Sequence, residues 1–200
     1  MIKRLLASTV KKHEKDGFIN IIYGPRQVGK TTLLHQLTHE VVKDDILWLN
    51  GDTQEAQEAL SSISDVKLGN LVNHRKVIVV DEAQRIENIG LSLKILIDAF
   101  PQKKFYVTGS SSLLLARGIK ESLTGRNKTY KLYPLSTSEL SIGFVPYKIA
   151  SLLEQQLLYG GYPYITNLSK PEEKRDYVKS IAEDYLFKDV LLLKEIEKPD

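Results

Sequence analysis

The chain has 200 residues, of which 42% are hydrophobic and 26% charged, and its formal net charge is +3. This composition favours one sizeable α/β domain with room for part of another, and the interspersed charges do not indicate a dedicated nucleic-acid binder. The absence of cysteine excludes disulfides and thiolate chemistry and fits a cytoplasmic location, and no apolar run approaches the roughly 18 residues that a membrane span requires.

The first residues, Met1 to Ala7, are basic and then apolar, and Lys11 and Lys12 interrupt the apolar run soon afterwards. The uninterrupted apolar stretch is too short for a secretion signal. We expect an amphipathic helix at this position.

Residues 24–31 read Gly-Pro-Arg-Gln-Val-Gly-Lys-Thr and match the phosphate-loop pattern GxxxxGK[ST]. The apolar stretch 18–23 predicts a buried parallel strand before the loop, and a helix is predicted after it. The apolar residues at helical spacing are Leu33, Leu34, Leu37 and Val41. Two glycines allow a tight turn with inward N–H groups, and the helix N-terminus adds the positive end of its dipole. The segment therefore predicts a nucleoside triphosphate site.

The polar residues of the loop have distinct expected roles. Lys30 is placed to neutralise the β and γ phosphates, and Thr31 offers a hydroxyl to Mg²⁺, which prefers hard oxygen ligands. The expected nucleotide-binding residues are Gly24, Pro25, Arg26, Gln27, Val28, Gly29, Lys30, Thr31 and Thr32. His35 and His39 have the spacing of metal ligands, but without a third ligand nearby we expect solvated surface residues.

A second strand is predicted over 46–50, followed by a helical pattern over 53–60. Asn50-Gly51-Asp52 is typical of a turn, and Asp52 or Thr53 can cap the helix. We expect Trp48 to lie in the core. Alternating strands and helices indicate a parallel sheet.

Residues 76–80 carry four β-branched aliphatic side chains and end in Asp81 and Glu82. In phosphate-loop enzymes the first such acid holds Mg²⁺, and the next can orient or deprotonate the attacking water. Taken alone, the pattern fits an ordinary turn or helix start equally well. Downstream of a phosphate loop, it favours Asp81 as a metal ligand and Glu82 as the catalytic carboxylate.

A helix is predicted over 89–100, and a strand over 104–108 leads into a hydroxyl-rich segment. Ligands of open α/β sheets bind beyond the carboxyl ends of the strands. A hydroxyl here could approach the γ-phosphate, with Ser110 the first candidate and Thr108 the second. The alternative is that Ser111 or Ser112 caps the following helix.

The last sheet strand is predicted over 127–132, and a boundary near Tyr133 separates a core of residues 1–133 from a helical region of residues 134–200. Ser169 and Glu172 form an S-x-x-E capping box that predicts a helix start. We expect the helical region to be the beginning of a C-terminal domain in a longer parent protein.

In combination these motifs resemble those of AAA-type ATPases of bacteria and archaea whose phosphate-loop domain precedes an uncharacterised C-terminal domain. The resemblance covers nearly the whole chain. The matching positions are Arg4, residues 24–32, 81–84, 108–111, 122–126, 134–136 with Glu139, and 160–163. It implies a five-stranded parallel sheet in the order 5-1-4-3-2 between helical layers, ATP with Mg²⁺, and Glu82 as the catalytic carboxylate. Tyr164 departs from the family pattern, in which an acidic residue often follows the proline.

Arg126 is a further catalytic candidate beside Glu82, Lys30 and Ser110, because a guanidinium near the γ-phosphate can stabilise transition-state charge. Sequence leaves open whether Arg126 serves its own site, a neighbouring subunit's site, or only a salt bridge at the start of a strand. Arg26 and Arg117 are weaker candidates, and we expect both to be surface charges.

The leading hypothesis is an ATPase whose hydrolysis drives a conformational change. The alternatives are a nucleotide-gated module that recruits a protein partner or a second copy, a DNA-directed protein and a small-molecule kinase. A GTPase should carry an Asn-Lys-x-Asp motif, which does not occur. The absence of a basic stripe weighs against DNA, and no membrane partner is expected.

Overall fold

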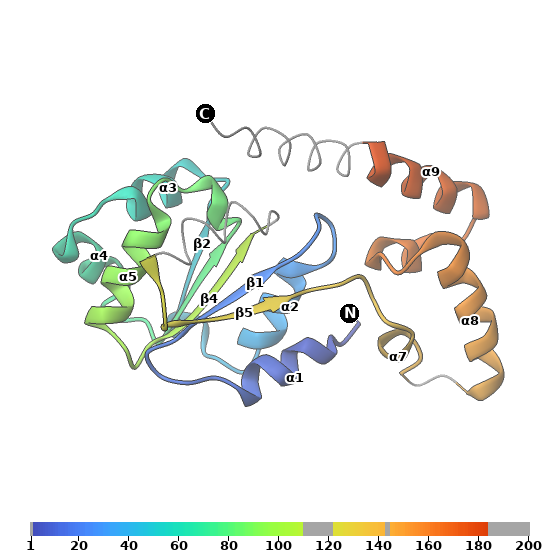
Figure 1. Cartoon of the computed structure of the whole chain (residues 1–200), viewed down its shortest axis with the longest axis horizontal. Coiled ribbons are helices and arrows are strands. Elements are labelled where there is room, and N and C mark those ends of the chain that lie inside the picture. Colours follow the sequence, from blue (N-terminus) through green and yellow to red (C-terminus); the bar gives the residue numbers. More distant parts are fainter. Residues whose placement is uncertain (1, 110–121, 143–144, 184–200) are drawn as a thin grey trace. The chain divides into compact units, whose positions relative to one another are not determined.

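The computed structural model describes residues 2–109, 122–142 and 145–183 (Figure 1). The chain packs into two compact units. The sheet unit comprises Leu5–Pro25 and Lys30–Leu132, and the helical unit comprises Met1–Arg4, Arg26–Gly29 and Tyr133–Asp200. The division into independent domains at residues 1–133 and 134–200 stays a prediction.

Five parallel strands form the sheet, in the order β2-β3-β4-β1-β5. They are β1 (Ile19–Tyr23), β2 (Ile46–Asn50), β3 (Val77–Asp81), β4 (Lys104–Gly109) and β5 (Asn127–Lys131). This is the predicted order 5-1-4-3-2 taken from the other edge, so the predicted fold class is confirmed. The strand bounds differ from the predicted ones by one residue or less. The last residue of β3 is Asp81 itself.

Helices cover both faces of the sheet (Figure 1). One side carries α1 (Leu5–Lys12) and α2 (Lys30–Thr38). The other side carries α3 (Gln54–Ser61), α4 (Asp65–Val72) and α5 (Ile89–Ala99). Thr53 caps α3 by accepting a hydrogen bond from the amide of Ala56, as the sequence predicts. Two short 3₁₀ helices, η1 (Lys43–Asp45) and η2 (Ala83–Arg85), connect these elements.

The main hydrophobic core lies between the sheet and α3–α5. Side chains alternate between the faces of a strand, so alternate residues of β3 and β4 point to this core. Ile78 and Val80 of β3 and Phe105 and Val107 of β4 pack there with Leu93 of α5. The intervening residues are also buried, because α1 and α2 cover the other face, and this accounts for the nearly continuous apolar runs in the sequence.

Two predictions about the first part of the sheet unit are wrong. Trp48 is half-buried rather than in the core, because β2 is an edge strand that, among the described strands, pairs only with β3. Its ring stacks on that of His35, with the centroids 4.4 Å apart. The helix after the phosphate loop ends at Thr38, so Val41 lies beyond it.

The helical unit contains α7 (Thr137–Leu140), α8 (Pro146–Tyr159), η3 (Pro163–Asn167) and α9 (Pro171–Ile181). The predicted capping box at Ser169 is wrong: Pro171 occupies the first turn, Lys170 is the N-cap, and no side chain caps α9. The same S-x-x-E pattern forms a capping box at the start of α7 instead, between Ser136 and Glu139. Among the residues that the structure describes, no helix has both the length and the hydropathy that spanning a bilayer requires.

Candidate functional site

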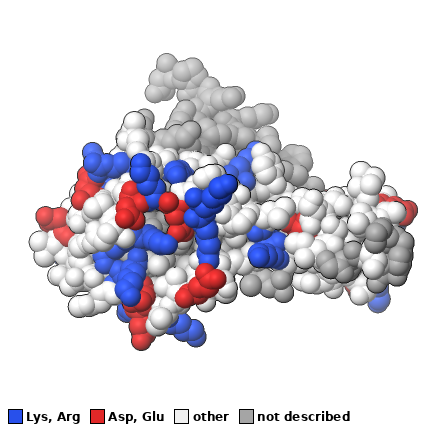
Figure 2. Space-filling view, turned by 90° about the horizontal axis from the view of Figure 1, so that it is seen from below, with Lys and Arg blue, Asp and Glu red and all other residues white. Residues whose placement is uncertain are grey.

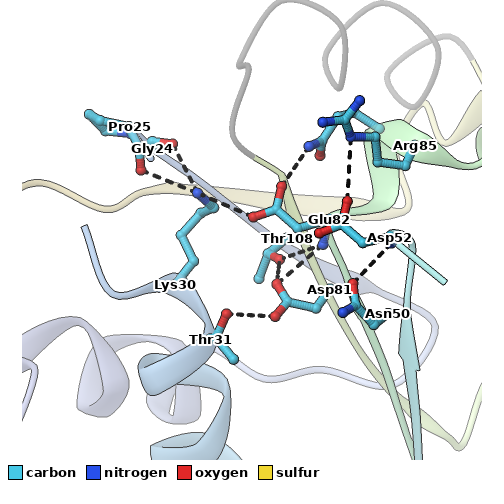
Figure 3. A network of polar contacts seen from close by, with 11 residues as sticks. Gly24, Pro25, Lys30, Thr31, Asn50, Asp52, Asp81, Glu82, Arg85 and Thr108 are labelled. Atoms are coloured by element: carbon cyan, nitrogen blue, oxygen red, sulfur yellow. Dashed lines mark hydrogen bonds and ion pairs between the residues drawn. The ribbon is translucent and has the colours of Figure 1, made fainter. Parts of the chain in front are cut away.

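Polar side chains from several elements converge at the carboxyl edge of the sheet (Figure 3). Parallel strands all end at the same edge, so the ends of β2, β3 and β4 lie together there. α2 begins at this edge as well, because it follows β1 after the phosphate loop. The predicted residues Lys30, Thr31, Asp81 and Glu82 are all part of this network.

Lys30 is the first residue of α2 and is 5% exposed. Its ammonium group donates hydrogen bonds to the carbonyl oxygens of Gly24 at 3.4 Å and Pro25 at 3.2 Å. The Nζ atom also lies 3.7 Å from Oε1 of Glu82. The charge of Lys30 is therefore held between the start of the phosphate loop and the acid that follows β3.

Thr31 and Asp81 supply two adjacent oxygen atoms. The Thr31 hydroxyl donates to Oδ2 of Asp81 at 2.6 Å, which joins the start of α2 to the end of β3. A hydroxyl and a carboxylate are ligand types that Mg²⁺ accepts, and Mg²⁺ in proteins usually keeps several waters and takes phosphate oxygens. Two protein oxygens this close together fit such a partly hydrated ion.

Glu82 has a left-handed backbone conformation, with φ 51° and ψ 43°. This conformation is uncommon for a residue other than glycine and costs roughly 1–2 kcal/mol. Its amide donates to Oδ1 of Asp81 and to Oγ1 of Thr108, each at 3.2 Å. The turn directs the side chain back toward Lys30, and Oε2 accepts a hydrogen bond of 2.6 Å from the side chain of Gln84.

Thr108 lies near the end of β4 and is fully buried. Its hydroxyl donates to Oδ1 of Asp81 and accepts from the amide of Glu82. One hydroxyl therefore holds both the side chain of the first acid and the backbone of the second. The sequence predicts a hydroxyl at this strand end but assigns it to the γ-phosphate, whereas the structure places it against the acids.

Gly51 is a site residue that the sequence analysis identifies only as part of a turn. Its amide donates to the carbonyl oxygen of Asp81 at 2.8 Å, and its own carbonyl accepts from the side chain of Gln57. A Cβ atom on Gly51 would lie 2.3 Å from the carbonyl oxygen of Glu82, so only glycine fits without displacing that peptide. Because β2 neighbours β3, the turn after β2 necessarily lies against the end of β3.

Gln84 belongs to the 81–84 segment that carries the family resemblance, but the sequence analysis assigns it no role. In the structure its side chain contacts the carboxylate of Glu82 from η2. Gln84 is therefore a candidate for orienting this acid.

The phosphate loop contains two left-handed residues, Gln27 with φ 58° and Gly29 with φ 94°. Between them, the side chain of Val28 is fully buried. Only the glycine adopts such an angle without steric cost. The loop therefore has a specific, partly strained backbone path, as expected of a segment whose amides surround a ligand.

Arg126 does not join this network. Arg126 precedes β5, and its carbonyl accepts a hydrogen bond from the amide of Ile19 at the start of β1. It forms an ion pair with Asp98 of α5. This is the amino edge of the sheet, opposite the edge that carries Lys30, so the structure does not bring Arg126 to its own chain's acids. Ser110 and Arg117 lie outside the described residues.

Charges on the face seen in Figure 2 are of mixed sign, with blue and red side chains interleaved over the sheet unit. Basic residues of the sheet unit pair with acids, for example Lys104 with Glu14 at 2.6 Å and Lys11 with Glu40 at 2.7 Å. These pairings match the near balance of charge in the sequence and do not favour a nucleic-acid surface on this face.

A family model described as AAA domain matches residues 16–141. One relative is an uncharacterized protein, MJ1544, of Methanocaldococcus jannaschii, which is 28% identical over 190 residues that cover 86% of this chain. The chain spans only 42% of the length of that relative.

Two solved structures share the fold. The Walker-type ATPase PABY2304 of Pyrococcus abyssi has a TM-score of 0.58 and 16% identity, with 98% of this chain and 77% of that one covered. A signal transduction ATPase with numerous domains and a tetratricopeptide repeat sensor, PH0952 of Pyrococcus horikoshii, has a TM-score of 0.54 and 15% identity, with 89% of this chain and 32% of that one covered. The sheet order, the phosphate loop at its edge and the family match lead to one conclusion: this chain belongs to the AAA domain family of nucleotide-binding, P-loop ATPase-type proteins.

Proposed function

We propose that the chain binds ATP with Mg²⁺ at the carboxyl edge of the sheet and hydrolyses it. The observation that carries this proposal is the meeting of Lys30 and Thr31, at the start of α2, with Asp81 and Glu82, at the end of β3. A cation, a hydroxyl and two carboxylates within one hydrogen-bonded network are the groups that phosphoryl transfer to water needs.

Each residue has a defined task in this mechanism. The amides of residues 24–31 and the ammonium of Lys30 hold the phosphates. Thr31 and Asp81 hold Mg²⁺, which neutralises charge on the transferred phosphoryl group when it is bound. Glu82 orients the attacking water and accepts its proton, while Thr108 and Gln84 fix the position of Glu82.

The released energy would drive a conformational change. Arg126 faces the amino edge of its own sheet, so a catalytic role for it requires a neighbouring subunit. A homo-oligomer in the cytoplasm is the arrangement we propose for that case.

Replacing Glu82 by Gln tests the catalytic role. Steady-state hydrolysis should fall by about 100- to 10,000-fold, the usual contribution of a general base, while Mg-ATP binding measured by calorimetry persists. Glu87→Gln is the matched control, because Glu87 is an exposed acid of the same stretch and its loss should leave turnover unchanged.

Two outcomes would contradict the proposal. Unchanged turnover in Glu82→Gln would exclude Glu82 as the catalytic carboxylate. If the wild-type chain gives no more binding heat with Mg-ATP than Lys30→Met does, the nucleotide site itself is excluded.

A second candidate is a nucleotide-gated module in which the bound state recruits a protein partner and turnover is incidental. Exposed apolar side chains on α8 favour it, with Leu157 at 79% and Leu158 at 65% exposure. If Glu82→Gln abolishes hydrolysis but leaves the biological activity of the full-length protein intact, this second function replaces the first.

A further inference from the structure

Arg4 is a buried arginine that the proposed mechanism does not use. It belongs to the helical unit and is 4% exposed. Its Nε lies 3.1 Å from Oε1 of Glu139, its Nη1 donates to the carbonyl oxygen of Val28 at 2.8 Å, and its Nη2 donates to that of Tyr133 at 2.5 Å. The guanidinium thus joins three segments that are distant in sequence, one of which is the phosphate loop.

Glu139, the acidic partner of Arg4, is itself held in place. It is 7% exposed, and its Oε2 accepts a hydrogen bond of 2.9 Å from the amide of Ser136 in the capping box of α7. One carboxylate oxygen therefore faces the helix start and the other faces Arg4. The rigid fork of the guanidinium then has a single orientation, which aims Nη1 at Val28.

A buried ion pair of this kind is weak evidence for a role in stability. Removing two charges from water costs several kcal/mol per ion, and apolar replacements of buried pairs are often neutral or stabilising. The feature that an apolar pair could not reproduce is the directed hydrogen bond to the loop carbonyl.

The bond fixes the direction of one amide of the phosphate loop. Because a peptide unit is planar and trans, the C=O of Val28 and the N–H of Gly29 point in opposite directions. Holding the Val28 oxygen toward Arg4 therefore turns the Gly29 N–H to the opposite side of the loop. Gly29 has φ 94°, and because glycine has no Cβ atom, sterics restrict the adjoining peptides less than at other residues, so an outside contact is needed to fix them.

We infer that Arg4 is a positioning residue for nucleotide binding: with Glu139 it locks the Val28–Gly29 peptide so that the Gly29 amide is presented to a phosphate. This inference rests on the proposed function. Arg4 does not touch the nucleotide, and it acts through the loop backbone. Its loss should weaken binding of polyphosphate more than it slows the chemical step, because Asp81 and Glu82 belong to the sheet unit.

The test uses the double variant Arg4→Met/Glu139→Gln in the full chain. It removes the hydrogen bond to Val28 without leaving a buried charge, and the glutamine retains an acceptor for the amide of Ser136. We expect the dissociation constant for Mg-ATP, measured by calorimetry, to rise by roughly 10- to 100-fold. This is the effect of losing one hydrogen bond to a charged group, here the bond from the Gly29 amide to a phosphate. KM should rise similarly, and kcat should change by less than about threefold.

Lys3→Met is the matched control, because it removes a positive charge from the neighbouring, exposed position and should leave the affinity unchanged. If the double variant does not unfold cooperatively, Arg4→Gln/Glu139→Gln replaces it. This variant keeps a neutral hydrogen-bonding pair, and the glutamine at position 4 is too short to reach Val28. The same changes in the dissociation constant, KM and kcat decide its outcome.

The outcomes separate the inference from the proposed function. If wild type binds Mg-ATP and a folded double variant binds it equally well, the positioning role of Arg4 is overturned while the nucleotide site stands. A fall in kcat at unchanged KM would likewise overturn it. If wild type itself does not bind Mg-ATP, the proposed function fails, and the inference fails with it.

Discussion

The two units of the chain are stabilised in different ways. The sheet unit surrounds its strands with an apolar core and confines its polar network to one edge. The helical unit is organised around polar contacts such as that between Arg4 and Glu139, while leucines of α8 stay exposed. These are Leu153, Leu157 and Leu158. The comparison indicates that hydrophobic burial dominates the first unit, whereas in the second a smaller set of buried apolar side chains is combined with directed hydrogen bonds.

Truncating one leucine in each unit is the strongest test of this contrast, because the two variants should differ most in their free energy of unfolding. Leu93 of α5 is fully buried in the core, and Leu93→Ala should lower the free energy of unfolding by about 2–5 kcal/mol. Leu157 of α8 is 79% exposed, so Leu157→Ala should change it by about 0.5 kcal/mol at most.

Urea unfolding followed by circular dichroism measures both values, and equal m-values would show that only stability has changed. A loss of more than about 2 kcal/mol in Leu157→Ala would mean that α8 packs against something in solution, and the contrast between the units would disappear.

Gly51 of the sheet unit and Gly161 of the helical unit both lie at a close backbone approach, and alanine at these two positions should have different consequences. A Cβ on Gly51 would meet the carbonyl oxygen of Glu82 at 2.3 Å, and a Cβ on Gly161 would meet that of Leu135 at 2.4 Å. Both substitutions should cost about 1–3 kcal/mol of stability through forced backbone shifts. Only Gly51→Ala should also lower kcat, because the displaced peptide carries the catalytic carboxylate.

Stability and turnover are measured on the same preparations of the two variants. A lowered kcat in Gly161→Ala, or an unchanged one in Gly51→Ala, would contradict the assignment of the catalytic edge to the sheet unit alone.

Sequence reasoning predicts the sheet unit better than the helical unit, for a physical reason. Buried parallel strands leave continuous apolar runs, and a phosphate loop must follow one strand and begin one helix. α4 was missed because its eight residues show a weak apolar pattern between two turns. In the helical unit, the S-x-x-E pattern recurs, and the pattern alone does not show that it forms a capping box at Ser136 while Pro171 moves the N-cap of α9 from Ser169 to Lys170.

The site divides in the same way. Lys30, Thr31, Asp81 and Glu82 stand out because their side chains would contact the ligand, and the structure does bring them together. Gly51, Gln84 and Arg4 act through other residues, so their roles depend on contacts that become visible only in the structure. The family resemblance includes Arg4 and Gln84 as matching positions but gives neither of them a role. Whether the assembled residues bind nucleotide stays a prediction.

Removing one hydroxyl in each unit gives a smaller but more specific comparison. Thr108 bonds both acids, so Thr108→Val should lower kcat by about tenfold with little change in KM, as a misplaced catalytic group would. Thr137 donates to the side chain of Gln156 at 2.6 Å, and Thr137→Val should cost about 1 kcal/mol of stability without affecting kcat.

Steady-state hydrolysis and urea unfolding of these two variants are sufficient to decide. If Thr108→Val retained full turnover, the hydroxyl would be a structural contact, and the positioning of Glu82 would depend on Gln84 and Gly51 alone.

The smallest expected effect concerns a buried polar group of the sheet unit, the hydroxyl of Tyr106. It shows that the interior of this unit is not purely apolar. Tyr106 of β4 is buried, and its hydroxyl donates to Glu14. Burial, and then the bond to this carboxylate, raise the pKa of Tyr106. Above about pH 10 the unfolded chain releases a proton that the folded chain retains, so folding stability should fall as the pH rises, by about 1.4 kcal/mol per unit.

Tyr106→Phe removes this proton and the bond together. At neutral pH the variant should be less stable than wild type by about 1 kcal/mol, the worth of one hydrogen bond. The difference should shrink and then reverse as the pH rises from about 8 to about 11, because only wild type loses stability through this group. Urea unfolding at several pH values measures the difference directly. If the difference in unfolding free energy between wild type and Tyr106→Phe stayed constant with pH, Tyr106 would ionise as readily in the folded chain as in the unfolded one. The interior of the sheet unit would then tolerate a charge that it is expected to exclude.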